Sequence, residues 1–178
     1  MPGARVKGWR AFLSVTADEN GNPVDARDRI GPGPWYDRLG RLVAPTLDDL
    51  LNERPLNGDA AIKDDLPNED GVPNHRPDPT QPEVDNHDTL TGSDEFGQLY
   101  SATATCKDWT AATGAASQGT PRCGHYWPRT GGPMPPFPDP AEMANWMSSL
   151  DESGCAPGVN LVEIGPPNPL DNTVGSGG

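Results

Sequence analysis

The chain has 178 residues, a length that fits a single domain. It carries 13 Lys and Arg residues against 26 Asp and Glu residues, which gives a formal net charge of −13. This charge argues against nucleic acid or an anionic membrane surface as a partner, because both require clustered positive charge. The 22 prolines and 21 glycines are together about twice the usual share, so much of the chain must be irregular.

Targeting segments and cysteines indicate the cellular compartment in which a chain resides. No stretch approaches the roughly 20 apolar residues of a membrane span, so no such span is expected. Residues 1–8 contain basic side chains but no apolar segment, so they do not form a signal peptide. The three cysteines, Cys106, Cys123 and Cys155, form no Cys-x-x-Cys pair. Their odd number fits one disulfide plus a thiol, or a fragment that lacks a partner cysteine.

The first half of the chain predicts short elements. In residues 9–16, apolar side chains alternate with others, which predicts a half-buried strand with Trp9, Ala11, Leu13 and Val15 on one face. Residues 17–34 carry turn chemistry, and residues 35–43 predict a short hairpin. Thr46 is a suitable N-cap for a short helix over 47–51, whose acidic residues lie in its first turn.

The second half predicts more loop. Residues 64–88 are rich in Asp, Asn, Pro and Glu, which indicates a long acidic surface loop. A strand is expected over 97–109, ending near Cys106 and Trp109, and residues 111–121 are expected to be loop. Residues 128–140 are too rich in proline for an interior strand. A helix capped by Asp139 should follow, with an apolar stripe at Met143, Trp146, Met147 and Leu150. A last short strand is expected near residues 159–164.

An ordered set of motifs resembles a known family. Residues 90–97, Leu-Thr-Gly-Ser-Asp-Glu-Phe-Gly, are followed by Cys-Lys-Asp-Trp at 106–109. Further motifs lie at residues 9–14, 26–35, 47–51, 121–125 and 154–161. Their order resembles the endostatin domain of certain collagens, and more closely the bacterial secreted domains of the same C-type-lectin-like type. The resemblance covers most of residues 9–175, and the order of the motifs is its specific part.

The resemblance implies an α+β fold with short strands, one or two short helices and long loops rich in Pro, Gly and Asp. It implies one domain over residues 1–178 that is truncated at both ends, because such domains usually add a cysteine-bearing helix before it and a cysteine-bearing strand after it. It also implies an inner disulfide that starts at the cysteine matching Cys106, with Cys155 or Cys123 as partner. We favour Cys123–Cys155, with Cys106–Cys155 as a close alternative.

The acidic loop is a candidate calcium site. Calcium accepts six to eight oxygen ligands in flexible geometry, and the candidate ligands are Asp64, Asp65, Asn68, Asp70, Asp85 and Asp88. The loop is not an EF-hand, because Leu66 and Pro77 would occupy positions that require carboxylates. The alternative is a solvated acidic loop without an ion. Residues 81–83, Gln-Pro-Glu, are similar to a sugar-binding turn of C-type lectins, but so short a match favours chance.

Other site chemistry has weaker support. The histidines are His75, His87 and His125, and no second ligand pair at zinc-finger spacing accompanies Cys123 and His125. A Gly-x-Ser-x-Gly nucleophile motif is absent. Trp127, beside a proline, is the best candidate for a partly exposed tryptophan, and with His125 it forms the candidate ligand-binding pair.

The predicted function is a non-enzymatic binding or adhesion module located outside the cell or at its surface. Its expected ligand is a glycan, a matrix polymer or a protein, and calcium is its candidate stabilising ion. The alternative is a metal-dependent hydrolase that uses the acidic loop and His87.

Overall fold

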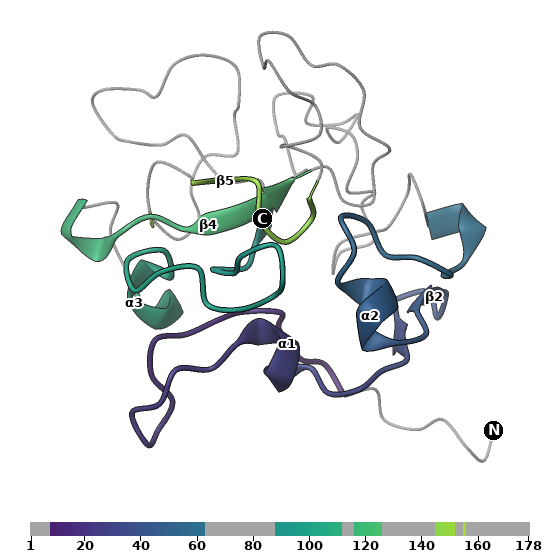
Figure 1. Ribbon diagram of the computed structural model, residues 1–178, viewed down its shortest axis with the longest axis horizontal. Coiled ribbons are helices and arrows are strands. Elements are labelled where there is room, and N and C mark those ends of the chain that lie inside the picture. The colour runs from purple at the N-terminus through teal and green to yellow at the C-terminus, as the bar shows by residue number, and fades with distance from the viewer. Residues whose placement is uncertain (1–7, 63–87, 112–115, 126–144, 152–154, 156–178) are drawn as a thin grey trace, which may run out of the picture.

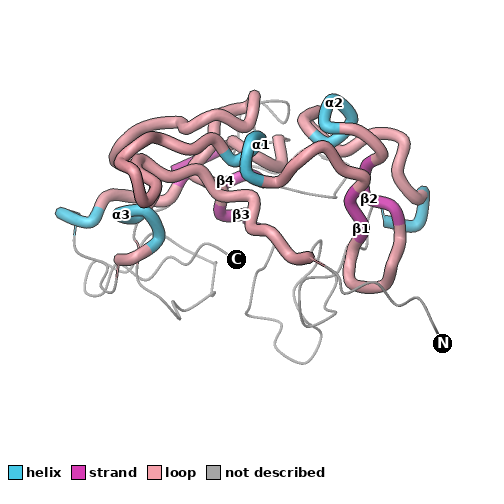
Figure 2. Tube along the Cα trace, turned by 90° about the horizontal axis from the view of Figure 1, so that it is seen from below, coloured by secondary structure: helices cyan, strands magenta, loops and turns pink. Residues whose placement is uncertain are grey.

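The computed structural model describes residues 8–62, 88–111, 116–125, 145–151 and 155 (Figure 1). Within these residues the fold is mixed α+β, with short helices and two small antiparallel sheets. Most of the described chain is loop (Figure 2). The predicted α+β class is therefore confirmed. Among the described residues, no helix is long and apolar enough to cross a membrane.

The first sheet is a hairpin of β1 (Trp35–Tyr36) and β2 (Leu42–Ala44), which confirms the hairpin predicted from the sequence. Two short helices flank it in the chain, α1 (Ala26–Arg29) and α2 (Leu47–Leu50). The predicted cap of α2 is present, since the Thr46 side chain accepts a hydrogen bond from the Asp49 backbone N–H at 3.2 Å. The 3₁₀ turn η1 (Ala60–Ile62) follows.

The second sheet has the order β3 (Asp88–Leu90), β4 (Arg122–His125) and β5 (Leu150–Asp151). The strand β4 is central, and its residue Cys123 lies opposite Leu90 on one side and Leu150 on the other. The remaining elements, α3 (Cys106–Trp109) and η2 (Ala116–Gln118), precede β4 in the chain.

The helix predicted up to residue 150 is wrong in its described part. Residues 145–149 are irregular, with bends at 146, 147 and 149, and Leu150 already belongs to β5. The cause is local, because the side-chain oxygen of Asn145 accepts the backbone N–H groups of Met147 and Ser148 at 2.8 and 3.0 Å. An Asn side chain that binds nearby backbone in this way competes with helix formation.

Two strand predictions are also wrong. In residues 9–16 only Val15 forms a bridge, to Val24, and the alternation fails because Trp9 is 69% exposed while Ser14 is fully buried. Over 97–109, Leu99 and Thr105 make isolated bridges with Ser93 and Pro121, and the segment ends in α3. In both segments the backbone follows hydrogen bonds to distant residues, such as Ser14 N–H to the Thr91 carbonyl at 2.8 Å.

The apolar core joins the hairpin and α2 to the segment before β5. Its buried members are Ile30, Val43, Ala44, Leu50, Ile62, Trp146 and Met147. The Trp146 indole N–H donates to the Leu50 carbonyl at 2.9 Å, and its ring centroid lies 4.6 Å from that of Phe12. Trp146 and Met147 are therefore buried, as their spacing suggested, although the segment is not helical.

One turn geometry occurs three times in the described chain. In each case an Asp carboxylate accepts the backbone N–H of the residue four positions later, at 2.8 or 2.9 Å. The residue three positions after the Asp is a glycine with a positive φ, which glycine adopts without steric cost. The pairs are Asp18 and Gly21, Asp37 and Gly40, and Asp94 and Gly97.

Candidate functional site

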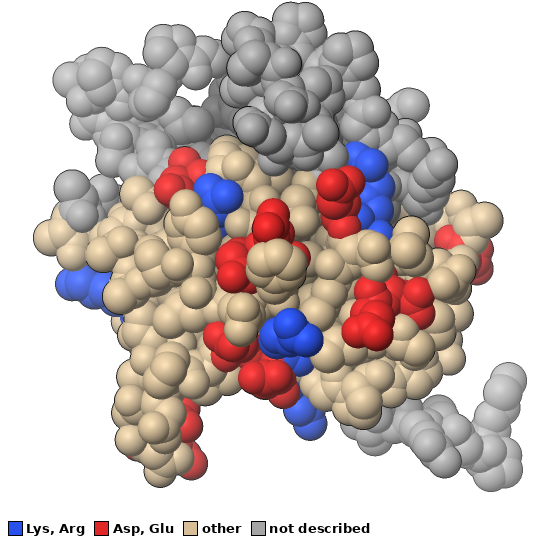
Figure 3. All heavy atoms as spheres, in the orientation of Figure 1, with Lys and Arg blue, Asp and Glu red and all other residues tan. Residues whose placement is uncertain are grey.

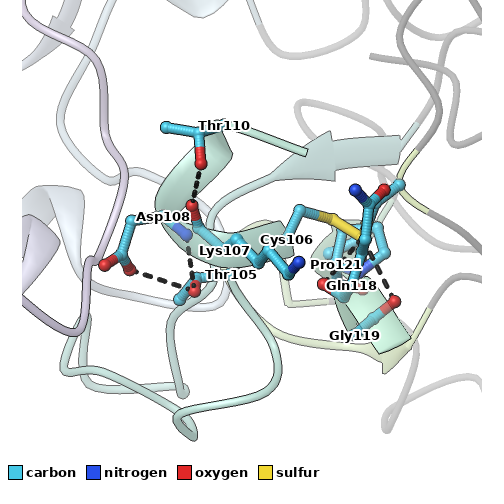
Figure 4. Close-up of a disulfide and its surroundings, with 10 residues drawn as sticks. Thr105, Cys106, Lys107, Asp108, Thr110, Gln118, Gly119 and Pro121 are labelled. Carbon is cyan, nitrogen blue, oxygen red and sulfur yellow. Dashed lines mark hydrogen bonds between the residues drawn. A yellow bond between two sulfur atoms is a disulfide. The ribbon is translucent and has the colours of Figure 1, made fainter. Parts of the chain in front are cut away.

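The Cys106–Cys155 disulfide connects α3 to the segment after β5 (Figure 4). The two Cα atoms lie 5.5 Å apart, and 49 positions separate the residues in the chain. The favoured pairing Cys123–Cys155 is therefore wrong, and the close alternative is correct. The physical reason is placement: Cys123 is buried in the middle of β4, where its thiol faces the Pro121 carbonyl. Cys155 instead lies beside Gly119, with its Sγ 3.2 Å from the carbonyl oxygen.

The turn that carries this disulfide is left-handed. All four residues of α3 have positive φ, with values of 49°, 54°, 53° and 64° from Cys106 to Trp109. None of them is glycine, and L-residues pay roughly 1–2 kcal/mol each for this conformation. Such a turn persists only where its surroundings hold it in place.

Asp108 and Trp109 attach the left-handed turn to the N-terminal segment. The Asp108 carboxylate accepts the backbone N–H and the hydroxyl of Thr16, each at 2.6 Å, and the Thr105 hydroxyl at 3.1 Å. Burial raises the pKa of this carboxyl, but the hydrogen bonds from Thr16 and Thr105 outweigh burial and hold the pKa below its ordinary value. The Trp109 indole N–H donates to the Ser14 carbonyl at 2.9 Å.

The interior beside this turn is built from hydroxyl groups. Ser14, Thr91 and Ser93 are fully buried. The hydroxyls of Ser14 and Ser93 are hydrogen-bonded at 2.8 Å, and the Thr91 hydroxyl donates to the Met147 carbonyl. The hydrogen-bond partners of these three hydroxyls in the described chain are backbone groups or other hydroxyls. The motif at residues 90–97 therefore has a structural role in joining distant segments.

A surface cluster lies around Arg122 of β4. Its guanidinium carbon stands 4.3 Å from the centroid of the Tyr100 ring. Its Nε donates to the Ser148 hydroxyl at 2.9 Å, and one terminal nitrogen contacts the Asp151 carboxylate at 3.4 Å. We call these four residues the Tyr100 surface. It combines an exposed aromatic ring, a largely buried cation and an exposed carboxylate from three chain segments, with the buried residue Ser148 beneath them.

The structure leaves most predicted site residues untested. The candidate calcium ligands Asp64, Asp65, Asn68, Asp70 and Asp85 lie outside the described residues, as do His87 and Trp127. Asp88 and His125 are described in their backbone only, where they lie opposite each other in β3 and β4. Within the described part of the chain, no three His, Cys, Asp or Glu side chains are grouped closely enough to hold a metal ion.

The Tyr100 surface was not predicted from the sequence. Its members are far apart in the chain, and no short motif contains two of the three residues Tyr100, Arg122 and Asp151. The pairing of β4 with β5 places Arg122 opposite Asp151, and backbone hydrogen bonds through Gly92 bring Tyr100 beside Arg122.

Comparisons with protein-family models, with curated proteins and with solved structures find no match to this chain.

Proposed function

We propose that this chain is a non-enzymatic extracellular binding or adhesion module with an endostatin-type, C-type-lectin-like fold. Its ligand would be a glycan, a matrix polymer or a protein. The order of the sequence motifs supports the fold, and the mixed α+β architecture with extensive loops is compatible with it.

The Cys106–Cys155 disulfide is the observation that carries the proposal. Disulfides persist in oxidising compartments and are rare in the reducing cytosol. This one fixes a left-handed turn in a chain with many loops, which is a structural use and not a catalytic one. A small domain with a modest apolar core gains most from such a crosslink.

The Tyr100 surface supports a binding role. Loops and strand ends held by a rigid framework are where binding residues concentrate. Here a sheet, a disulfide and a hydroxyl network fix the segments that carry the exposed groups. The buried hydroxyls of Ser14, Thr91 and Ser93 have no His or carboxylate partner in the described chain, so they support no hydrolytic arrangement there.

The test is a binding screen with oxidised protein. The chain would be produced in an oxidising compartment, labelled, and applied to arrays of glycans, extracellular matrix polymers and extracellular proteins. We expect saturable binding to at least one class, and retention of the disulfide in the bound protein. Absence of binding to all three classes would remove the proposal, as would a chain isolated from its native source with all three cysteines reduced.

A further inference from the structure

The guanidinium of Arg122 is held in one orientation by neighbours from two other segments. These neighbours are the Tyr100 ring at 4.3 Å, the Ser148 hydroxyl at 2.9 Å and the Asp151 carboxylate at 3.4 Å. The Arg122 side chain is only 16% exposed. An Arg fixed in this way loses little conformational entropy when a further group hydrogen-bonds to it.

The Tyr100 ring is presented to solvent from a fixed backbone. The backbone N–H of Tyr100 donates to the Gly92 carbonyl at 3.0 Å, and the backbone N–H of Gly92 donates to the Arg122 carbonyl at 2.9 Å. The ring and the guanidinium therefore come from hydrogen-bonded backbone segments. Tyr100 is 45% exposed although the guanidinium stands over one face of its ring. A tyrosine exposed to this extent offers an apolar contact surface beside polar groups.

Asp151 supplies an accessible acceptor next to this platform. Its side chain is 47% exposed. Its one described hydrogen bond, to Arg122, is long at 3.4 Å. Within the described chain, the other carboxylate oxygen of Asp151 has no hydrogen-bond partner. A ligand hydroxyl could donate to this oxygen and accept from the guanidinium at the same time.

We propose that the Tyr100 surface binds a neutral saccharide. A pyranose ring has an apolar C–H face that packs on an aromatic ring, and its hydroxyls both donate and accept hydrogen bonds. The Tyr100 surface offers the matching platform, carboxylate acceptor and guanidinium donor. This inference rests on the proposed binding function and names the ligand class of the same site.

Charge favours a neutral ligand over an acidic one. The chain carries a net charge of −13, and Asp and Glu side chains are spread over the face drawn in Figure 3. The single positive charge of Arg122 is already compensated by Asp151. An acidic polysaccharide would meet a repulsive field and no uncompensated cation on the Tyr100 surface.

The experiment is affinity electrophoresis of the oxidised, folded chain. Native gels would contain galactomannan, xyloglucan or mixed-linkage β-glucan as neutral probes, and polygalacturonate as the acidic probe. We expect retardation by at least one neutral polysaccharide and none by polygalacturonate. Tyr100→Ala should weaken binding about tenfold, since an aromatic platform contributes on this order. Tyr100→Phe, which keeps the ring, should bind like the parent chain.

Two further variants separate the site from general effects. Asp151→Asn should weaken binding because it removes the anionic acceptor. The side chain is 47% exposed, so this variant should fold like the parent chain, which circular dichroism would verify. Phe96→Ala removes another exposed aromatic, on the turn that Asp94 forms, and should leave binding unchanged. If Tyr100→Ala fails to fold, the test is the polysaccharide binding of Asp151→Asn and Phe96→Ala. Weaker binding by Asp151→Asn alone would support the Tyr100 surface, and equal binding by the two variants would overturn it.

The outcomes distinguish the site from the function. Retardation that persists in both Tyr100→Ala and Asp151→Asn would overturn the Tyr100 surface but leave the binding function intact. Binding to polygalacturonate alone, or to none of the neutral probes, would overturn the neutral-saccharide assignment. The matrix-polymer and protein arrays would then decide the proposed function separately.

Discussion

At the scale of single residues, the interior beside α3 is held together by buried hydroxyl groups in addition to the apolar core. Thr91 shows why these groups are required. Its hydroxyl donates to the Met147 carbonyl and accepts the Ser93 N–H at 3.1 Å, and the side chain is fully buried. A buried polar group that loses its partner costs about 1–3 kcal/mol, more than the net gain from an ordinary hydrogen bond. The pattern of apolar residues in the sequence cannot reveal such a network.

Thr91→Val tests this network. Val keeps the shape of Thr but leaves the Ser93 N–H and the Met147 carbonyl without their partner. We expect the free energy of unfolding to fall by about 2–3 kcal/mol. Thr91→Ser is the matched control, because it keeps the hydroxyl and removes one methyl, which costs about 1 kcal/mol. Urea denaturation measures the free energy of unfolding of both variants. A Val variant as stable as the Ser variant would show that the hydroxyl contributes nothing.

Asp108 should make stability depend on pH. Its hydrogen bonds with Thr16 and Thr105 lower its pKa in the folded state. A carboxyl with a lowered folded pKa stabilises the fold above its unfolded pKa of about 3.9. That stabilisation is lost as the pH falls through the folded pKa. Urea midpoints of the parent chain should therefore decrease between neutral and strongly acidic pH.

Asp108→Asn is the variant that isolates this contribution. It should lower stability at neutral pH and make the acid-side decrease shallower than in the parent chain. Asp18→Asn is a suitable comparison. The backbone N–H of Asn22 also lowers the pKa of Asp18, but this carboxyl lies on a surface turn and binds only residues of its own turn. Asp18→Asn should therefore change the pH dependence of stability less than Asp108→Asn does. Identical pH profiles for Asp108→Asn and the parent chain would refute the role given to Asp108.

At the scale of elements, the sequence predicted what local contacts determine. The hairpin β1–β2 and the helix α2 each contain their own signals, such as the Thr46 cap that binds Asp49. The segment before β5 contained a signal of equal quality, a helical stripe through Trp146 and Met147. There the side chain of Asn145 bound the backbone instead. The stripe identified buried residues but not their conformation.

The candidate site was less predictable than the fold. The left-handed turn α3 contains no glycine, so nothing in Cys-Lys-Asp-Trp indicates positive φ. It exists because Asp108, Trp109 and the disulfide each bind a distant segment. The Tyr100 surface likewise depends on the pairing of β4 with β5. Long-range contacts of this kind are not encoded in short motifs.

Gly124 offers a test of the packing between β4 and the segment that contains Trp146. A Cβ atom at Gly124, in the central strand β4, would collide with the backbone carbonyl of Trp146. Backbone cannot move aside as a flexible side chain can, so Gly124→Ala should cost at least about 3 kcal/mol or prevent folding. Gly21→Ala is the control. That glycine has a φ of 82° but open space around it, so its cost should be about 1–2 kcal/mol.

Thermal unfolding of the two glycine variants gives the comparison. Gly124→Ala should have the lower midpoint, and a loss of cooperative unfolding in this variant alone would agree with the collision. Equal midpoints would mean that β4 and the Trp146 segment do not pack as closely as described.

At the scale of the whole molecule, the large negative charge allows a cation to stabilise the chain. We propose calcium binding by residues 64–88, whose candidate ligands include Asp64 and Asp70. Millimolar calcium should raise the midpoint of thermal unfolding, because an ion that binds only the folded state stabilises it by mass action. Magnesium should do so less, since it demands stricter geometry and retains its water.

The control for calcium is ionic strength. Sodium chloride at matched ionic strength screens repulsion between the acidic side chains without binding specifically. An equal rise of the unfolding midpoint with sodium chloride, magnesium and calcium would therefore indicate screening and contradict a specific calcium site. Asp64→Asn combined with Asp70→Asn should abolish the part of the rise that is specific to calcium.

The disulfide holds Cys155, the last described residue, against α3. It closes a segment of 49 positions, for which the chain-entropy model gives a stabilisation of about 4 kcal/mol. Reduction by dithiothreitol, or the paired change Cys106→Ser and Cys155→Ser, should therefore lower the free energy of unfolding by about this amount. The left-handed turn should relax at the same time, because Cys106 is one of the points that hold it.

Cys123→Ala is the control, since Cys123 is buried but forms no disulfide. Dithiothreitol should lower the free energy of unfolding of this variant as it does that of the parent chain. A thiol assay on unfolded, unreduced protein should find one reactive thiol. Three reactive thiols, or a parent chain that dithiothreitol does not destabilise, would contradict both the crosslink and the extracellular role built on it.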